Sequence, residues 1–391
     1  MATDLDLVVL GGGCAGLSLA LRLAEDRGLC RRVAVLESRQ AYRHDRSWCF
    51  WRTGTHRYER LVKRSWSHLA LRSAARAVQV DCTGTPYQLL ESGAFYDHAL
   101  QALAASAAVR LQTGVTVLEP PRSVPGGWRI ETSAGGLTAA QVIDTRPPGP
   151  PQCGDALLWQ SFLGEELVCD RAVFDPGRVD LMDFANDLPG AVAFTYVLPL
   201  ACDRALVETT LFHPQPHGPC DLARRQQQAV QRLCGGASRQ VVRAEAGILP
   251  MGMAPPPAAL GPGHCRAGLM SGAARPATGD AFLRIQRWAD RCSAALRGGR
   301  GPLGHAPDPP LTRLMDRLFL DVLRCHPERG PELFTRLFGH TTTPRVIRFL
   351  SDHSSFTDRV AVAASLPTGL FLRQLLRSTP HGAARVPAPA P

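Results

Sequence analysis

The N-terminus of this sequence leaves little freedom in the choice of fold. An apolar run of strand length at 5–10 leads directly into the turn 11–16, which has the spacing G-x-G-x-x-G. A helical pattern of apolar residues follows at 17–24, and a second apolar run, 33–36, ends at Glu37. This order of strand, glycine turn, helix, strand and acid is typical of the β-turn-α-β unit that binds dinucleotides.

The glycines of this turn have distinct physical roles in such a unit. Gly11 permits the tight turn, Gly13 lets the backbone approach a pyrophosphate, and Gly16 lets helix and strand pack closely. The helix N-terminus offers free N–H groups and the positive end of its dipole to the phosphates. Glu37 can accept hydrogen bonds from ribose hydroxyls, and its charge would repel a 2′-phosphate. The sequence therefore predicts FAD or NAD rather than NADP here, with an ordinary glycine-rich turn as the alternative.

The composition is that of a globular protein. Of its residues, 45% are hydrophobic and 20% are charged. A length of 391 residues suits two closely packed domains. The formal net charge of +10 favours an anionic partner such as a phospholipid surface or a pyrophosphate. Its basic residues are nearly all arginine, a preference that codon bias in a GC-rich genome would also explain. No aromatic residues interleave with a basic stripe, so we expect no nucleic-acid partner.

Cysteine usage and hydropathy indicate an intracellular protein. The 12 cysteines are scattered without a C-x-x-C pair, and no signal peptide precedes the first strand. We therefore expect reduced thiols, a cytoplasmic location and no metal site. No apolar run approaches the ~20 residues that cross a bilayer, but peripheral attachment to a membrane stays open.

Breaks in the pattern divide the chain. A Pro/Gly run at 147–151 ends the first α/β segment, two β-rich runs at 192–200 and 204–213 indicate a hairpin, and a second Gly/Ala-rich turn at 269–279 precedes a helical pattern. We predict an α/β fold with an α+β insertion: a split Rossmann-like FAD-binding fold, a β-sheet substrate domain and a helical C-terminal region. The predicted boundaries are 1–150 and 251–300 for the two parts of the FAD-binding domain, 151–250 for the β-rich substrate domain, 301–378 for the helical region and 379–391 for a mobile tail.

The second turn is a candidate for contact with a flavin. Gly272, Ala273, Thr278 and Gly279 offer small side chains and backbone N–H groups at the start of a helix. Such groups could hold the ribityl-phosphate of a flavin or the polar edge of its ring. A plain turn between a loop and a helix is the alternative.

Several segments resemble the bacterial-type lycopene cyclases, and they do so in order along nearly the whole chain. Where that family usually has His, Tyr and Trp, this chain has Arg275, Asp280 and Glu165. The similar segments are D-R-S-W-C-F at 45–50, F-L-G-E-E at 162–166, L-M-D at 181–183, F-T-Y-V-L-P at 194–199, L-V-E-T-T at 206–210, the glycine turn at 272–279 and R-V-I-R-F at 345–349.

The resemblance implies a specific chemistry. Members of this family convert the linear ψ end groups of lycopene into β-ionone rings without net redox change. The resemblance further implies that FAD in its reduced form stabilises a carbocation, that NAD(P)H is the reductant, and that the protein lies at a membrane surface to collect a carotenoid. Such a reaction needs an acid that protonates an alkene, a site without water, and a base.

Glu208 is the candidate for the acid. Period-2 alternation places it on one strand face with Leu206, Thr210 and Phe212. If that face borders a flavin cavity, burial would raise the pKa of the carboxyl and keep a proton available near neutral pH. The resemblance points to the same residue as the catalytic acid and base. From the pattern alone, a solvated glutamate on an outer face is equally compatible.

Other side chains are candidates for supporting roles. Glu166 and Asp183 could belong to a proton relay, or could be structural hydrogen-bond partners. Trp48, Phe50 and Tyr196 could line a carotenoid channel, although core packing explains aromatic residues in such segments equally well.

Two other functions fit the same layout. One is a flavin-dependent monooxygenase or hydroxylase, but that class typically carries an Asp beside the ribityl chain, which the stretch 270–274 lacks. The other is a non-catalytic flavoprotein or carotenoid-binding module. The apolar pattern at 349–376 fits either a mouth on the membrane or helices packed on the core.

Overall fold

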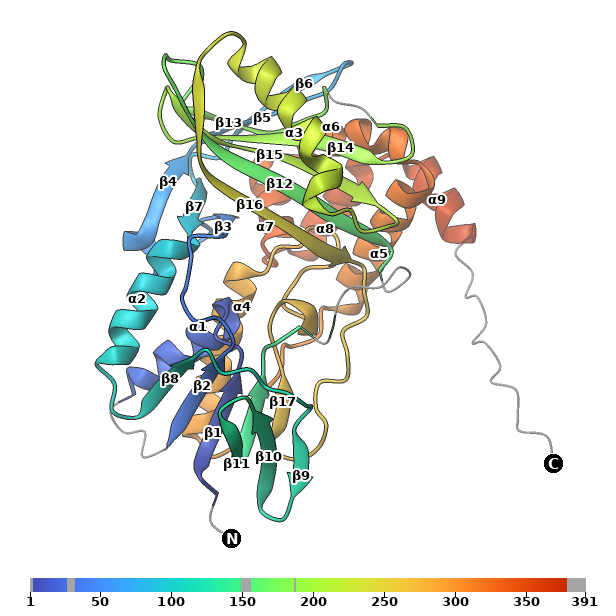
Figure 1. Cartoon of the computed structure of the whole chain (residues 1–391). Coiled ribbons are helices and arrows are strands. Elements are labelled where there is room, and N and C mark those ends of the chain that lie inside the picture. The colour runs from blue at the N-terminus through green and yellow to red at the C-terminus, as the bar shows by residue number, and fades with distance from the viewer. Residues whose placement is uncertain (1–2, 27–31, 148, 150–155, 186–187, 378–391) are drawn as a thin grey trace, which may run out of the picture.

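The fold is built from two large sheets and a group of C-terminal helices. Figure 1 places one sheet at the bottom, the second at the top, and the C-terminal helices beside the upper sheet. The predicted tail 379–391 and most of the Pro/Gly run 147–151 lie outside the described residues. The computed structural model describes residues 3–26, 32–147, 149, 156–185 and 188–377.

The first sheet has the Rossmann-like topology that the sequence predicts. Its strands are β1 (Leu5–Leu10), β2 (Val33–Glu37), β8 (Val109–Thr113), β9 (Arg122–Val124), β10 (Gly127–Thr132), β11 (Gly135–Asp144) and β17 (His264–Arg266). Four parallel strands follow the order β8-β2-β1-β11, and β17 also pairs with β11 in parallel. The predicted fold class is therefore confirmed.

Helices from distant parts of the chain cover this sheet. Helix α1 (Cys14–Ala24) begins in the first glycine turn and packs against α4 (Phe282–Arg297), which follows the second turn. Helix α2 (Ser92–Ala104) packs on α1. Because β17 and α4 return to the first sheet after the β-rich insertion, the Rossmann-like unit is split in the chain (Figure 1).

The second sheet is mainly antiparallel and holds the predicted hairpin. Its strands are β5 (His68–Arg72), β6 (Ala77–Asp81), β12 (Leu158–Cys169), β13 (Arg178–Asp183), β14 (Val192–Pro199), β15 (Arg204–His213) and β16 (Arg239–Met251), in the order β16-β12-β15-β14-β13-β5-β6. Helix α3 (Pro219–Cys234) covers one face of β12 and β15. The opposite face carries Phe194, Leu206 and Phe212 into a hydrophobic core.

Strands β5 and β6 differ from the predicted division of the chain. They fall within 1–150, yet β5 pairs in parallel with β13 and so extends the second sheet. A short sheet of β3 (Ser47–Trp51), β4 (Val62–Trp66) and β7 (Tyr87–Glu91) connects the two large sheets. Five-residue strands carry no sequence signal for which sheet edge they will pair with, because that choice depends on tertiary contacts.

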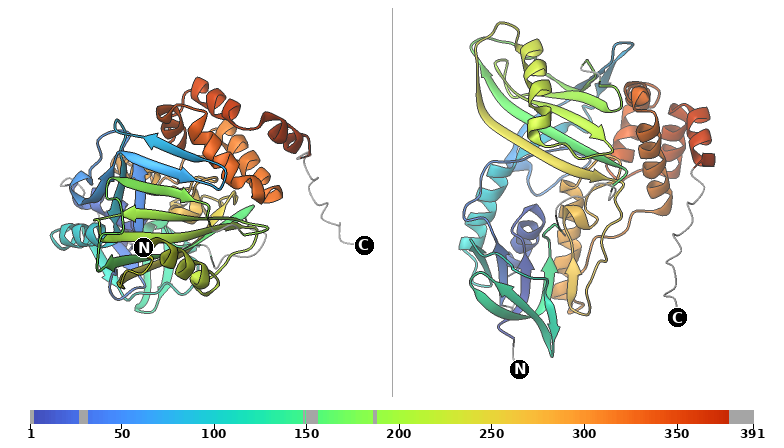
Figure 2. Two further views of the ribbon diagram at one scale, coloured as in Figure 1. Left: turned by 90° about the horizontal axis from the view of Figure 1, so that it is seen from above. Right: turned by 45° about the vertical axis from the view of Figure 1, so that its right-hand side comes forward.

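The C-terminal region is helical, as predicted. It packs against the second sheet (Figure 2). Buried apolar side chains of both contribute to the larger hydrophobic core. No helix among the described residues is both long and apolar enough to cross a bilayer. The helices are α5 (Pro310–Cys325), α6 (Gly330–Gly339), α7 (Thr343–Leu350), α8 (Phe356–Ser365) and α9 (Thr368–Arg377).

Arg275 joins the second turn to this helical region through a buried ion pair. Its Nε and Nη2 donate to Asp316 of α5, each at 3.0 Å, and both side chains are almost fully buried. The guanidinium also lies 4.4 Å from the centre of the Phe349 ring. Its Nη1 donates a hydrogen bond to the backbone carbonyl oxygen of Phe349. Arg275, which replaces the usual histidine of the resembled family, therefore has a structural role: it links the second turn to α5.

Arg275→Met is expected to lower the free energy of unfolding by about 3–5 kcal/mol, because it leaves the Asp316 carboxylate buried without a partner. The double variant Arg275→Met, Asp316→Leu is expected to recover much of that loss. Urea denaturation followed by circular dichroism measures both. Equal stability of the single and double variants would contradict a pairing role for Arg275.

Candidate active site

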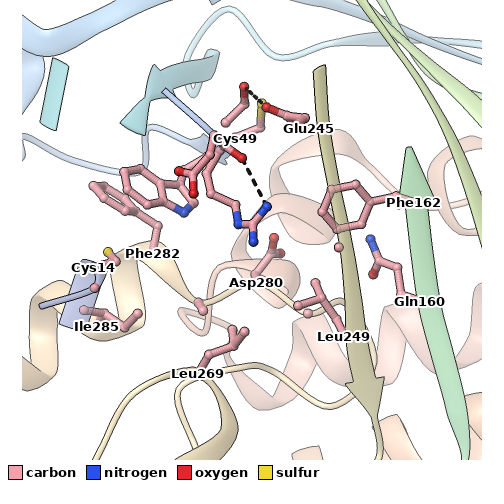
Figure 3. A pocket seen from close by; sticks show the side chains of 18 of the residues that line it. Cys14, Cys49, Gln160, Phe162, Glu245, Leu249, Leu269, Asp280, Phe282 and Ile285 are labelled. Atoms are coloured by element: carbon pink, nitrogen blue, oxygen red, sulfur yellow. Dashed lines mark hydrogen bonds between the residues drawn. The ribbon is translucent and has the colours of Figure 1, made fainter. Parts of the chain in front are cut away.

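A cavity of about 540 Å³ lies between the Rossmann-like unit and the second sheet. Figure 3 shows its walls, with side chains that come from both glycine turns, from β3 and from the second sheet. A volume of this size lies within the range of small-molecule and cofactor sites. The lining includes Gly13, Cys14, Arg39, Trp48, Phe162, Tyr196, Leu198, Leu206, Glu208, Glu245, Leu249, Thr278, Gly279, Asp280 and Phe282.

Strand pairing explains why these side chains share one wall. Gly164 of β12 lies directly opposite Glu208 of β15 on one side and Glu245 of β16 on the other, so all three project to the same face. A Cβ atom at Gly164 would lie 3.3 Å from Glu245 Cγ and 3.4 Å from Glu208 Cβ. The missing side chain therefore gives room for two carboxyl groups across one strand.

The environment of Glu208 favours its neutral form. Burial, together with the charge of Glu245, raises the pKa of the Glu208 carboxyl to about 8. The carboxyl keeps some accessible surface because it borders the cavity. Thr210 donates a hydrogen bond to it at 3.0 Å, which acts in the opposite direction. Glu208 can thus carry a proton at neutral pH in a largely apolar surrounding.

Glu245 is held by a network that reaches away from the cavity. Ser47 donates to it at 2.8 Å, and Arg243 forms an ion pair with it. Arg243 also donates to Ser47 at 2.9 Å and to Glu166 at 2.9 Å. Figure 3 shows Glu245 and its hydrogen bond at the upper edge of the cavity. These contacts fix the second carboxylate beside Glu208.

Glu166 and Asp183 lie outside the cavity lining. Burial acts to raise the pKa of Glu166, but hydrogen bonds and ion pairs from Arg243 and Arg204 outweigh it, so the pKa falls below its usual value. Asp183 pairs with Arg232 at 2.9 Å. Of the two, only Glu166 is linked to the site, through the Arg243 side chain.

The first glycine turn has the geometry of a nucleotide cradle. Gly11 has φ +95°, and a Cβ atom at Gly16 would lie only 1.9 Å from the carbonyl oxygen of Gly11, so both positions require glycine. A Cβ atom at Gly13 would meet no atom within 4 Å. Gly13 thus leaves open space at the N-terminus of α1, where a pyrophosphate could approach the backbone.

Glu37 ends β2 as predicted and is engaged within the protein. It accepts from the Gly12 N–H at 2.8 Å and pairs with Arg39 at 3.0 Å, and it does not line the cavity. Burial acts to raise its pKa, but the bonds from Arg39 and Gly12 prevail and lower it. Glu37 is therefore a carboxylate that orients Arg39, which does line the cavity.

The second turn contributes part of its predicted residues to the cavity. Thr278 and Gly279 line it, whereas Gly272 and Ala273 do not. Gly272 and Gly279 have positive φ angles of +99° and +73°, so they shape the turn. Asp280, the next residue, lines the cavity and is accessible there. Desolvation by the cavity walls raises the pKa of its carboxyl to about 6.

The predicted aromatic residues divide between cavity and core. Trp48 and Tyr196 line the cavity. Phe50 is buried in the core and stacks on Phe282 at 5.3 Å between ring centres, which is the core-packing alternative. Trp48 also stacks on Phe282, at 5.1 Å.

Sequence reasoning missed Glu245 and gave Asp280 no role. Glu245 shares its strand face with Gly247 and Leu249, so a carboxylate among small and apolar cavity-facing residues was the available signal. That signal becomes specific only when the pairing of β16 with β12 is known, because this pairing places Glu245 across Gly164 from Glu208.

Comparisons with known proteins give a family and a fold. The sequence model of the family described as "Lycopene cyclase protein" matches residues 6–376. No curated protein sequence matches the chain significantly.

Several solved structures have a similar fold. A geranylgeranyl bacteriochlorophyll reductase-like protein from Thermoplasma acidophilum has 13% identity and a TM-score of 0.60, covering 95% of this chain and 98% of its own. The p-nitrophenol 4-monooxygenase PnpA from Pseudomonas putida DLL-E4 has 17% identity and a TM-score of 0.56, covering 96% and 98%. The flavin-dependent monooxygenase PieE, solved with FAD and substrate, has 13% identity and a TM-score of 0.59, covering 95% and 73%.

At these identities the structural likeness concerns the fold alone, whereas the family match covers nearly the whole sequence. It includes both glycine turns, all strands of the cavity wall and the C-terminal helices. The resemblance predicted from separate segments is therefore confirmed over one continuous match, and the chain belongs to the lycopene cyclase family.

Proposed function

We propose that this protein cyclises the linear end groups of lycopene, or of a related linear carotenoid, to β-ionone rings by acid–base catalysis without net redox change. The observation that carries the proposal is Glu208, a carboxyl group with a raised pKa on the wall of a cavity bordered by both glycine turns. Alkenes are very weak bases, so their protonation needs an acid held neutral in a site without bulk water.

The proposed reaction is an isomerisation, because one proton is added to the substrate and one is removed. Glu208 gives its proton to the terminal double bond of the linear end group, which leaves a carbocation. A neighbouring double bond attacks this centre and closes the ring. The Glu208 carboxylate then accepts a proton from the ring, which places the ring double bond and restores the acid. Apolar neighbours such as Leu206 and Phe162 keep water from the cation.

The cavity also suits a flavin cofactor. Gly13 leaves space for a pyrophosphate at the start of α1, and Thr278 and Gly279 border the same cavity from the second turn. We propose FAD as this cofactor, with NAD(P)H as the source of electrons. When bound in its reduced form, FAD would supply a planar, negatively charged ring that stabilises positive charge in the substrate.

Collection of the substrate requires contact with lipid, because a long hydrocarbon does not dissolve in water. Helix α9 exposes Leu372, Leu375 and Leu376, with relative exposures of 58%, 44% and 70%, next to Arg373 and Arg377. Apolar side chains flanked by arginines are typical of a helix that lies on an anionic membrane surface. We propose peripheral attachment through this helix.

Glu245→Gln is expected to shift the basic limb of the pH–rate profile to lower pH. The charge of Glu245 helps to raise the pKa of Glu208, so its removal lets Glu208 lose its proton sooner as the pH rises. Arg243, freed from its partner, acts in the same direction. Glu245→Asp retains the charge and is the matched control. If the basic limb of the pH–rate profile does not shift in Glu245→Gln, the charge of Glu245 does not raise the pKa of Glu208.

A reconstituted assay tests the proposed function. Purified protein with FAD is supplied with lycopene in phospholipid vesicles under anaerobic conditions, with the flavin either reduced or oxidised. We expect cyclic products of unchanged mass, formed faster with reduced flavin. Equal rates in the two redox states would remove the proposed role of the flavin charge. Oxygenated products in air, with NADPH consumption, would instead favour the monooxygenase alternative.

A further inference from the structure

A second cavity, of about 510 Å³, lies among the C-terminal helices. Its walls come from α5, α6, α7, α8 and α9, which form the helical group in the right-hand view of Figure 2. The side chains that face it are almost all apolar, and they include Met315, Phe319, Phe334, Leu366 and Phe371. A cavity of this size and lining can hold a substantial hydrocarbon.

This cavity adjoins the candidate active site at the second glycine turn. Thr278 lines both cavities, and Arg275 and Ala277 line the apolar one from the same turn. The charged groups in its wall, Arg275 and Asp316, are paired with each other. The described lining therefore offers no free charge that could bind a lipid headgroup.

The opposite side of the cavity opens toward α9. Ala363, Thr368, Gly369, Leu372 and Leu375 line it there, and all five are exposed. The leucines are part of the apolar surface for which we propose membrane contact. The lining of this cavity thus runs from the candidate membrane surface on α9 to the second glycine turn, whose Thr278 also lines the cavity that contains Glu208.

We propose that this cavity binds the trailing polyene of the carotenoid while its end group lies beside Glu208. The inference rests on the proposed function and adds a binding site to it. The active-site cavity of about 540 Å³ must accommodate both a flavin ring and the reacting end group. The remainder of a long linear substrate needs a second apolar space, and the cavity that shares Thr278 supplies it.

Two adjacent alanines provide a matched test. Ala363 and Ala364 are both exposed on α8, but only Ala363 lines the cavity. Ala363→Trp is expected to lower kcat/KM for lycopene at least tenfold, because the indole would occupy the space of the polyene. Ala364→Trp is expected to leave it unchanged. Gly369→Phe is an independent second variant, since a Cβ atom there meets no atom within 4 Å.

A shortened substrate separates this inference from the proposed function. A truncated apocarotenoid with the same linear end group needs less of the second cavity, so Ala363→Trp is expected to cyclise it at the wild-type rate. If wild-type protein cyclises neither substrate, the proposed function fails. If it cyclises both, and Ala363→Trp and Gly369→Phe slow both equally or neither, the inference is overturned.

Binding of a fluorescent polyene gives a readout without catalysis. cis-Parinaric acid is titrated into full-length protein, and its fluorescence reports transfer to an apolar site. We expect at least tenfold weaker binding in Ala363→Trp and in Gly369→Phe, and unchanged binding in Ala364→Trp. Wild-type affinity in both cavity variants would overturn the assignment of this cavity to the polyene.

Discussion

Glu208→Gln is expected to lower the turnover of lycopene by about a thousandfold, within the range that general acid catalysis contributes. The amide keeps the size and the hydrogen bond from Thr210 but cannot deliver a proton to an alkene. Because burial raises the pKa of the Glu208 carboxyl, the folded protein favours its neutral form, which the amide resembles. The free energy of unfolding near neutral pH is therefore expected to stay unchanged. Pigment analysis of purified reactions measures the rate, and thermal unfolding confirms the fold.

Glu165→Gln is the matched control for this variant. Glu165 lies on the neighbouring strand β12 but faces the other side of the sheet, where Gln226 of α3 donates to it at 3.3 Å. Its neutralisation is expected to leave turnover within about twofold of wild type, as for substitutions away from a reacting centre. Comparable loss in both variants would show that charge or strand structure, and not proton delivery, explains the effect.

Gly13→Val is expected to weaken FAD binding by at least about a hundredfold, which corresponds to a loss of roughly 2.7 kcal/mol. The backbone of Gly13 has negative φ, and its Cβ position is open, so the chain should fold normally. The added isopropyl group would fill the space that we assign to the pyrophosphate. Flavin fluorescence titration of the apoprotein measures the affinity.

Gly54→Val controls for the general effect of a valine in an exposed loop. A Cβ atom at Gly54 likewise meets no atom within 4 Å, and Gly54 does not line the cavity. Its affinity for FAD is expected to match wild type. Undiminished FAD binding in Gly13→Val would mean that the first glycine turn does not hold the cofactor.

The Rossmann-like unit could be predicted from sequence because its constraints are local. The turn at Gly11 needs a positive φ, and the contact between Gly16 and the Gly11 carbonyl oxygen tolerates no side chain. Both requirements act within six residues of each other. For Glu208, period-2 alternation within one strand predicts which residues share its face, but only tertiary packing determines that this face borders the cavity.

The remainder of the site depends on register between distant strands. Glu245 reaches Glu208 only because Gly164 pairs with both, and no local pattern fixes that register. Glu166 fits a relay by sequence position, but its ion pairs with Arg204 and Arg243 come from two other strands. Only these contacts between distant strands show that Glu166 is held by arginines outside the cavity lining, whereas Glu208 lines the cavity.

Cyclisation in deuterated water tests the central claim most directly. If a carboxyl group of the protein, exchanged with solvent, protonates the alkene, each ring formed should carry one deuteron, with no oxygen gained. Glu208→Gln should form labelled rings about a thousandfold more slowly than wild type. Mass spectrometry of the carotenoid products reads both outcomes. Cyclic products without deuterium, or labelled rings formed at the wild-type rate by Glu208→Gln, would contradict protonation by Glu208.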